Sequence, residues 1–181
     1  MKNLLLDILR WVLVAVVVVL IGIISLNHRW TSEMREFRMS RIPVLLGASS
    51  ISYRSEEICG AGFMPGDDEA GVTVYPLPAS VLDAISQQGL SFFDGIDPDW
   101  PEWKPTPLIK DDSRWPEAKS PFLGFIHLHS CGLEIVPSVV EAIDEAIATP
   151  GNYYAFKKNR REGVVLVVVP SRGEAFFFFA G

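Results

Sequence analysis

The sequence predicts an α+β protein: one N-terminal transmembrane helix, then an antiparallel or mixed sheet with two main helices and a C-terminal β-hairpin. Three observations support this prediction. An uncharged apolar run lies near the N-terminus, strand and helix patterns alternate through the middle, and two apolar strands end the sequence. The 181 residues suffice for one modest domain with an appendage. We expect a transmembrane anchor at 1–27, a juxtamembrane linker at 28–41 and an α+β globular domain at 42–181.

The anchor is predicted by an apolar run that is long enough to cross a bilayer. From Trp11 to Leu26 the chain carries no charge, and Trp11 and Trp30 flank the run as interfacial aromatic residues do. In a helix these tryptophans would lie roughly 28 Å apart, close to the ~30 Å hydrocarbon thickness of a bilayer. A cleaved signal peptide would end in small residues, and a buried core helix would have a polar face. The run has neither feature, so we predict an uncleaved single-pass membrane anchor.

Two arguments from the charges on either side of the run favour opposite orientations of the helix in the membrane. Four arginines between residues 29 and 41 outnumber Lys2 and Arg10 before the run, which slightly favours a cytoplasmic domain. Exporting a tail that carries Lys2, Asp7 and Arg10 would desolvate several charges, which favours the reverse. We expect an extracytoplasmic domain in a bacterial-type envelope and leave the opposite orientation open.

Residues 28–41 are predicted to form a mixed-charge juxtamembrane helix. Trp30, Met34 and Phe37 recur at helical spacing and would lie along the membrane interface. A solvated stalk is the alternative interpretation. Pro43 discourages helix in the residue before it, so the domain is expected to begin near that position.

The middle of the chain is predicted to hold two similar strand–helix–strand units. The first comprises a strand at 71–75, a helix at 80–88 and a strand at 90–94, and the second comprises a strand at 122–130, a helix at 138–148 and a strand at 152–156. A proline precedes each helix and a glycine follows it. The segment SVLDAI at 80–85 aligns with SVVEAI at 138–143, which indicates a βαβ pseudo-repeat. Chance similarity between two amphipathic helices is the alternative.

The C-terminal residues predict a β-hairpin. GVVLVVVP at 163–170 and AFFFFAG at 175–181 are continuous apolar strands. The SRGE segment between them supplies a tight turn in which Gly173 can take a positive φ. Because such strands are typically buried on both faces, we expect the hairpin at the centre of the sheet.

The first candidate site is a possible metal centre at His127, His129 and Cys131. On a strand these alternate residues would share one face, and imidazole and thiolate are ligands of zinc and copper. Cys59 or Glu57 would supply a fourth ligand. Successive residues on one face of a strand lie ~7 Å apart, which makes it difficult for them to bind the same ion. The alternative is a strand whose histidines have no metal-binding role. We therefore expect no cofactor, with zinc or copper as the alternative.

The two cysteines are the second feature of interest. They are too few for a scaffold built on disulfides. Cys59 and Cys131 nevertheless form one candidate disulfide if the domain faces an oxidising compartment.

The long loop at 95–121 is the candidate partner-binding segment. It contains Trp100, Trp103 and Trp115 together with six prolines. Exposed tryptophan beside proline suits a protein-binding surface, because flat aromatic side chains offer a large contact area at little entropic cost. The alternative is that these tryptophans pack down as a hydrophobic lid over the sheet.

Composition and motifs narrow the classes of function. A formal net charge of −6 argues against a general nucleic-acid binder. The chain contains no nucleophile elbow, phosphate loop or dinucleotide fingerprint, and no motif assigns it to a characterised family. We expect a non-enzymatic, membrane-anchored domain that binds another protein. Metal binding is the first alternative, and a membrane-proximal hydrolase with a histidine base and a carboxylate such as Glu134 is the second.

Overall fold

The structure is a computed structural model of the chain, and it describes residues 2–58, 69–108, 120–127, 132–157 and 163–180. The chain divides into two compact units, Met1–Ser40 and Arg41–Gly181. Each unit has its own architecture.

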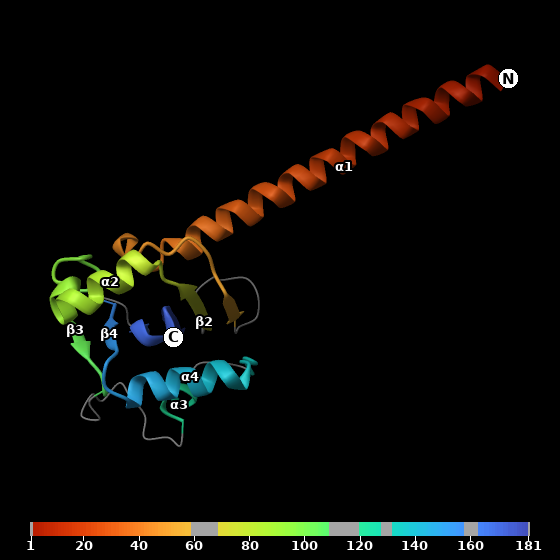
Figure 1. The fold of residues 1–181 in the computed structure, drawn as a ribbon. Coiled ribbons are helices and arrows are strands. Elements are labelled where there is room, and N and C mark those ends of the chain that lie inside the picture. The colour runs from red at the N-terminus through yellow and green to blue at the C-terminus, as the bar shows by residue number, and fades with distance from the viewer. Residues whose placement is uncertain (1, 59–68, 109–119, 128–131, 158–162, 181) are drawn as a thin grey trace. The chain divides into compact units, whose positions relative to one another are not determined.

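The first unit is a single helix, α1 (Lys2–Met39), drawn in red and orange in Figure 1. Its stretch from Arg10 to Met39 is long and apolar enough to cross a membrane. The side chains from Arg10 to Glu33 are exposed, and Trp11 has 74% of its surface accessible. A bilayer is an environment that accommodates such a continuous apolar surface. The helix continues through residues 28–39, as predicted for the juxtamembrane segment.

The second unit is built on one six-stranded sheet with the strand order β1-β2-β6-β5-β4-β3. All neighbouring strands are antiparallel. The strands are β1 (Tyr53–Ile58), β2 (Glu69–Pro76), β3 (Trp103–Pro105), β4 (Tyr153–Phe156), β5 (Gly163–Val169) and β6 (Glu174–Ala180).

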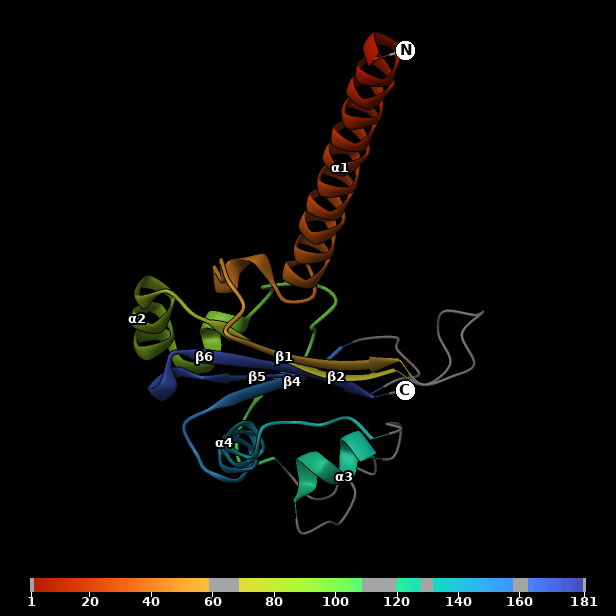
Figure 2. The ribbon, with the colours of Figure 1, turned by 90° about the vertical axis from the view of Figure 1, so that its right-hand side faces the viewer.

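Helices cover both faces of this sheet, which Figure 2 shows nearly edge-on. Helix α2 lies on one face, and α3 and α4 lie on the other. The α-helices of this unit are α2 (Ala79–Gln88), α3 (Pro121–His127) and α4 (Pro137–Ala148). The 3₁₀ helices are η1 (Val44–Leu46), η2 (Gly89–Phe93) and η3 (Pro170–Arg172). The predicted α+β class is confirmed.

The β5–β6 hairpin occupies the middle of the sheet, as predicted. Residues 164–169 of β5 are all buried, so this strand is covered on both faces. Gly173 follows η3 with a φ of 66°, the left-handed conformation that a glycine adopts without a steric penalty.

Alternation along β6 divides the core into two halves. The Phe178 ring lies 5.0 Å from the Phe122 ring of α3, while the Phe177 ring lies 6.3 Å from the Trp100 ring. Since adjacent strand residues point to opposite faces, Phe178 belongs to the α3–α4 side and Phe177 to the other. Ile143 and Ile147 of α4 are buried in the same cluster as Phe178.

Arg41 opens the second unit on the face that carries Phe177. Its guanidinium lies 4.9 Å from the ring centroid of Phe179 and 5.6 Å from that of Phe177. Arg41 Nη1 also lies 2.5 Å from Glu56 Oε1 on β1, and both side chains are largely buried. Planar guanidinium can stack on rings and bind a carboxylate at once, which fixes the start of the domain against its sheet.

The strand predicted at 90–94 is wrong, because the segment forms the 3₁₀ helix η2. Gly89 and Gly95 bracket it with φ values of 58° and 68°. A positive φ lies outside the extended region, so the chain departs from strand geometry at both ends of the segment. The turn directs Phe93 into the core, where its ring stacks on Trp103 at 4.2 Å.

The strand predicted at 122–130 is also wrong where the structure describes it, since α3 covers this segment up to residue 127. Phe122, Phe125 and Ile126 have helical spacing, and all three are buried. Without strands at 90–94 and 122–127, each predicted unit retains one strand in the described chain, β2 before α2 and β4 after α4. Within the described residues, neither unit is therefore a βαβ motif.

Candidate functional site

Two of the three candidate tryptophans are buried in the domain core. Trp100 is 2% exposed and Trp103 is 9% exposed. Trp100 packs against Phe177, and Lys157 Nζ lies 5.8 Å from its ring centroid. This is the lid-like packing considered as the alternative interpretation. Trp115 lies outside the described residues, so we base no binding surface on the tryptophan loop.

Of the candidate metal ligands His127, His129, Cys131 and Cys59, the structure describes only the first. His127 is the last residue of α3, whereas His129, Cys131 and Cys59 lie outside the described residues. Within the residues that the structure describes, no group of three potential metal ligands lies together. The strand that would have aligned the histidines is a helix as far as residue 127. The metal centre and the disulfide remain predictions.

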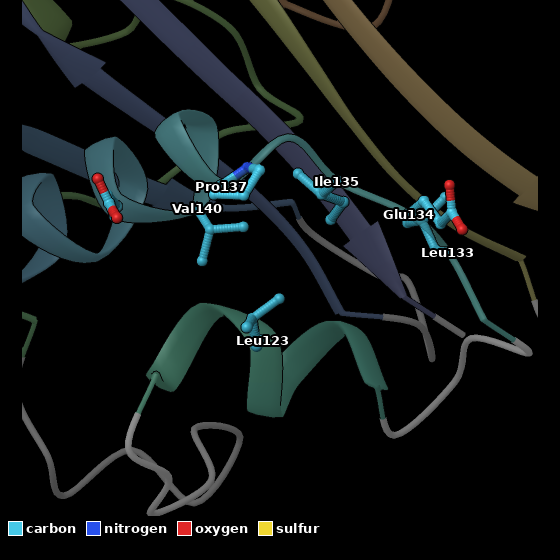
Figure 3. A pocket seen from close by; sticks show the side chains of 7 residues that line it. Leu123, Leu133, Glu134, Ile135, Pro137 and Val140 are labelled. Atoms are coloured by element: carbon cyan, nitrogen blue, oxygen red, sulfur yellow. The ribbon is translucent and has the colours of Figure 1, made fainter.

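A groove between α3 and α4 is the candidate functional site of this domain. Its volume is about 510 Å³. Apolar side chains form its walls, namely Leu123, Leu133, Ile135, Pro137 and Val140. Figure 3 shows Leu123 on α3 facing Val140 and Pro137 of α4. We call this site the α3–α4 groove.

The extended segment before α4 is held in place by β1. Ser55 Oγ donates a hydrogen bond to the carbonyl oxygen of Glu134 at 2.7 Å. The backbone N–H of Val136 donates to the hydroxyl oxygen of Tyr53 at 3.0 Å. Tyr53 and Ser55 alternate along β1 and so point to the same face of the sheet. These two bonds fix the wall of the groove that carries Leu133 and Ile135.

The opposite wall is positioned by a contact between the two helices. The backbone N–H of Phe122 donates to Asp144 Oδ1 at 3.1 Å, which supplies an acceptor for an amide in the first turn of α3. Phe122 and Ile126 are fully buried on the core side of α3. With those positions facing the core, Leu123 is left to line the groove.

Two glutamates give the groove its charge. Glu134 lies on the extended segment, Glu141 lies on α4, and both residues are exposed. Among the residues that the structure describes, neither carboxylate forms a hydrogen bond or an ion pair. The groove therefore combines apolar walls with two acidic side chains that are exposed to solvent. Glu134 is also the carboxylate that the sequence suggested for a hydrolase.

Sequence reasoning did not find this groove. Its walls come from two helices and an extended segment, and one of those helices was predicted as a strand. The available signal was the amphipathic helix at 138–148, whose predicted range nearly coincides with α4. No family model, curated protein or solved structure matches the chain.

Proposed function

We propose that the protein is a single-pass, membrane-anchored binding module whose α+β domain recognises a segment of another protein in the α3–α4 groove. The anchor is α1, and the proposed activity is binding without catalysis. The observation that carries the proposal is the groove itself, which is a hollow with mostly apolar walls on the surface of the domain.

The size and lining of the groove support the binding of a folded peptide segment. Small-molecule and cofactor sites commonly have volumes of about 300–1,000 Å³, mostly apolar walls and a few polar groups. The groove has about 510 Å³, five apolar residues and two carboxylates. A groove lined by helices accepts the apolar face of another helix through a few anchoring side chains.

Photo-crosslinking in membranes tests this proposal. A photoreactive residue would replace Val136, which is half-exposed beside the groove, in the full chain. The matched control would carry the same residue at Gln87, which is exposed on α2. We expect a discrete protein adduct from position 136 and no such adduct from position 87. Identical adduct patterns at both positions, or none at either, would contradict the proposal.

We further propose that the domain is extracytoplasmic. Its support is the charged tail before the apolar run, whose export would be costly. In intact cells, a membrane-impermeant thiol reagent should label Cys59 and Cys131 only after reduction. Labelling that needs lysis but no reductant would show a cytoplasmic domain with free thiols.

Metal binding remains the second proposal, and one structural observation favours it. Glu57 Oε2 is buried and has no hydrogen-bond partner in the described part of the domain. Glu57 was considered as a ligand beside His127, His129 and Cys131. Elemental analysis of the purified full chain should then find stoichiometric zinc or copper, and the Glu57→Gln chain should hold less. A metal-free chain whose melting temperature does not respond to chelator would exclude this proposal.

A further inference from the structure

The charge of the α3–α4 groove indicates which kind of segment it binds, provided that the groove is a protein-binding site. We propose that its occupant is a cationic amphipathic helix, in which an apolar face is flanked by Lys or Arg. The apolar face would contact Leu123, Ile135 and Val140. The basic side chains would meet Glu134 and Glu141.

The positions of the two carboxylates carry this inference. Glu134 lies on the segment before α4, and Glu141 lies one turn into the helix, next to Val140 of the groove wall. An acidic segment docked against the apolar walls would bring like charges together, whereas a basic one would form ion pairs. Such charge complementarity chiefly determines specificity and association rate.

A different role for these carboxylates must be distinguished from partner recognition. Both lie near the N-terminus of α4, where negative charge stabilises a helix through its macrodipole. That role predicts a small change in stability when the charges are reversed and no change in the preference for a ligand. Binding therefore has to be measured separately from folding.

The experiment uses the full chain in phosphatidylcholine nanodiscs, with the photoreactive residue at position 136. The probe is a synthetic amphipathic helix of Leu and Lys, about 14 residues or four turns long. The comparison peptide has the same Leu positions and Glu in place of Lys. We expect the Leu/Lys peptide to bind and crosslink at position 136, and the Leu/Glu peptide to bind at least about tenfold more weakly, because like charges would meet in the groove.

Charge-reversal variants separate the groove from the net charge of the protein. Glu134→Lys with Glu141→Lys should weaken binding of the Leu/Lys peptide by about tenfold or more. Asp83→Lys with Glu102→Lys changes the net charge equally at exposed positions away from the groove and should leave binding unchanged. All four side chains are exposed, so the variants are expected to fold; the melting temperature of each checks this.

Three outcomes would overturn the inference. If both peptides bind equally and crosslink at position 136, the groove binds peptides but does not select a basic one. If both charge-reversal variants weaken binding equally, the attraction is a general effect of net charge. If neither peptide crosslinks at position 136, the occupant is not a helix of this kind. The membrane crosslinking experiment is independent of peptide charge, so it tests the proposed binding function separately.

Discussion

Arg41 illustrates how one residue can set the start of a folded unit. Its guanidinium binds Glu56 and covers two aromatic rings, and only 17% of its side-chain surface is exposed. Loss of Arg41 would take the nearer guanidinium from a largely buried carboxylate and leave Arg54 Nη1 at 3.9 Å from Glu56 Oε2, which is more costly than loss of a surface pair.

We expect Arg41→Ala to lower the free energy of unfolding by about 2–3 kcal/mol, because it removes both the ion pair and the cation–π contacts. Chemical denaturation of the full chain in detergent would measure this change. Arg172→Ala is the control, since the Arg172–Glu174 pair is more exposed, at 46% and 27%. It should change stability by less than about 0.5 kcal/mol. If the two substitutions lowered the free energy of unfolding equally, the Arg41–Glu56 pair would stabilise the domain no more than an exposed pair does.

Gly163 is a second residue whose identity is dictated by a close contact. A Cβ atom at this position would lie 2.5 Å from two ring carbons of Phe125. Gly163→Ala should therefore lower the free energy of unfolding by about 1–3 kcal/mol through overpacking. Thermal melting of the single variant would measure the loss.

The packing of α3 on β5 can be tested in the same experiment. Addition of Phe125→Leu to Gly163→Ala removes the ring that the new methyl group would meet. The double variant should lose less stability than the sum of the two single losses. If the stability losses of the two single variants simply added in the double variant, the contact between Phe125 and Gly163 would be contradicted.

At the scale of elements, the sequence predicted the strands and helices whose patterns are long and regular. The helices at 80–88 and 138–148 and the strands at 71–75 and 163–170 lie within about two residues of α2, α4, β2 and β5. Each has either a sustained apolar pattern or a proline at its start. These elements define the central sheet and one helix on each face.

The elements that were missed are short, and their environment decides their structure. For residues 122–127, aromatic content favoured a strand, while the spacing of Phe122, Phe125 and Ile126 indicated a helix. Contacts of this segment with Asp144 of α4 and Phe178 of β6 favour the helix, and such tertiary contacts cannot be read from a single sequence. β1 carries Arg54, Glu56 and Glu57, charges that are typical of an edge strand, and it lacks the apolar alternation by which a strand is recognised in a sequence.

The N-terminal turn of α3 depends on a side chain from α4. Asp144→Ala removes the acceptor of the Phe122 N–H, so we expect faster amide hydrogen exchange in α3 and a loss of about 1 kcal/mol of stability. Glu145→Ala, at the neighbouring exposed position, is the matched control. Hydrogen-exchange mass spectrometry would compare the two variants. Unchanged exchange in α3 of the Asp144 variant would contradict this packing.

At the scale of the whole molecule, the order of the two units was predictable and the candidate site was not. The apolar run is a one-dimensional signal, so its length and charge indicate a span directly. The α3–α4 groove requires Leu123 and Val140 to meet, and that meeting depends on the packing of α3. The three tryptophans were obvious in the sequence, yet burial of Trp100 and Trp103 removes two of them from the surface.

The boundary between the units makes a prediction about truncation. A chain that begins at Ser40 should remain in the aqueous phase and retain the domain's circular dichroism, because it lacks α1 but keeps Arg41. A chain that begins at Ile42 should melt roughly 5–10 °C lower, since it keeps the buried Ile42 side chain but loses the Arg41 contacts. Phase partitioning and thermal melting would measure these properties. Equal melting temperatures of the two truncated chains would show that Arg41 does not stabilise the domain.

The central position of β6 has a consequence for the biogenesis of the protein. β6 is the last strand to be synthesised, yet it alone connects β2 to β5 in the sheet. Until β6 has been synthesised, β2 and β5 have no common partner, so β1-β2 and β5-β4-β3 cannot join into one sheet. Helix α1 precedes all six strands in the chain, so it is synthesised and can enter a bilayer before the sheet of the second unit can be completed.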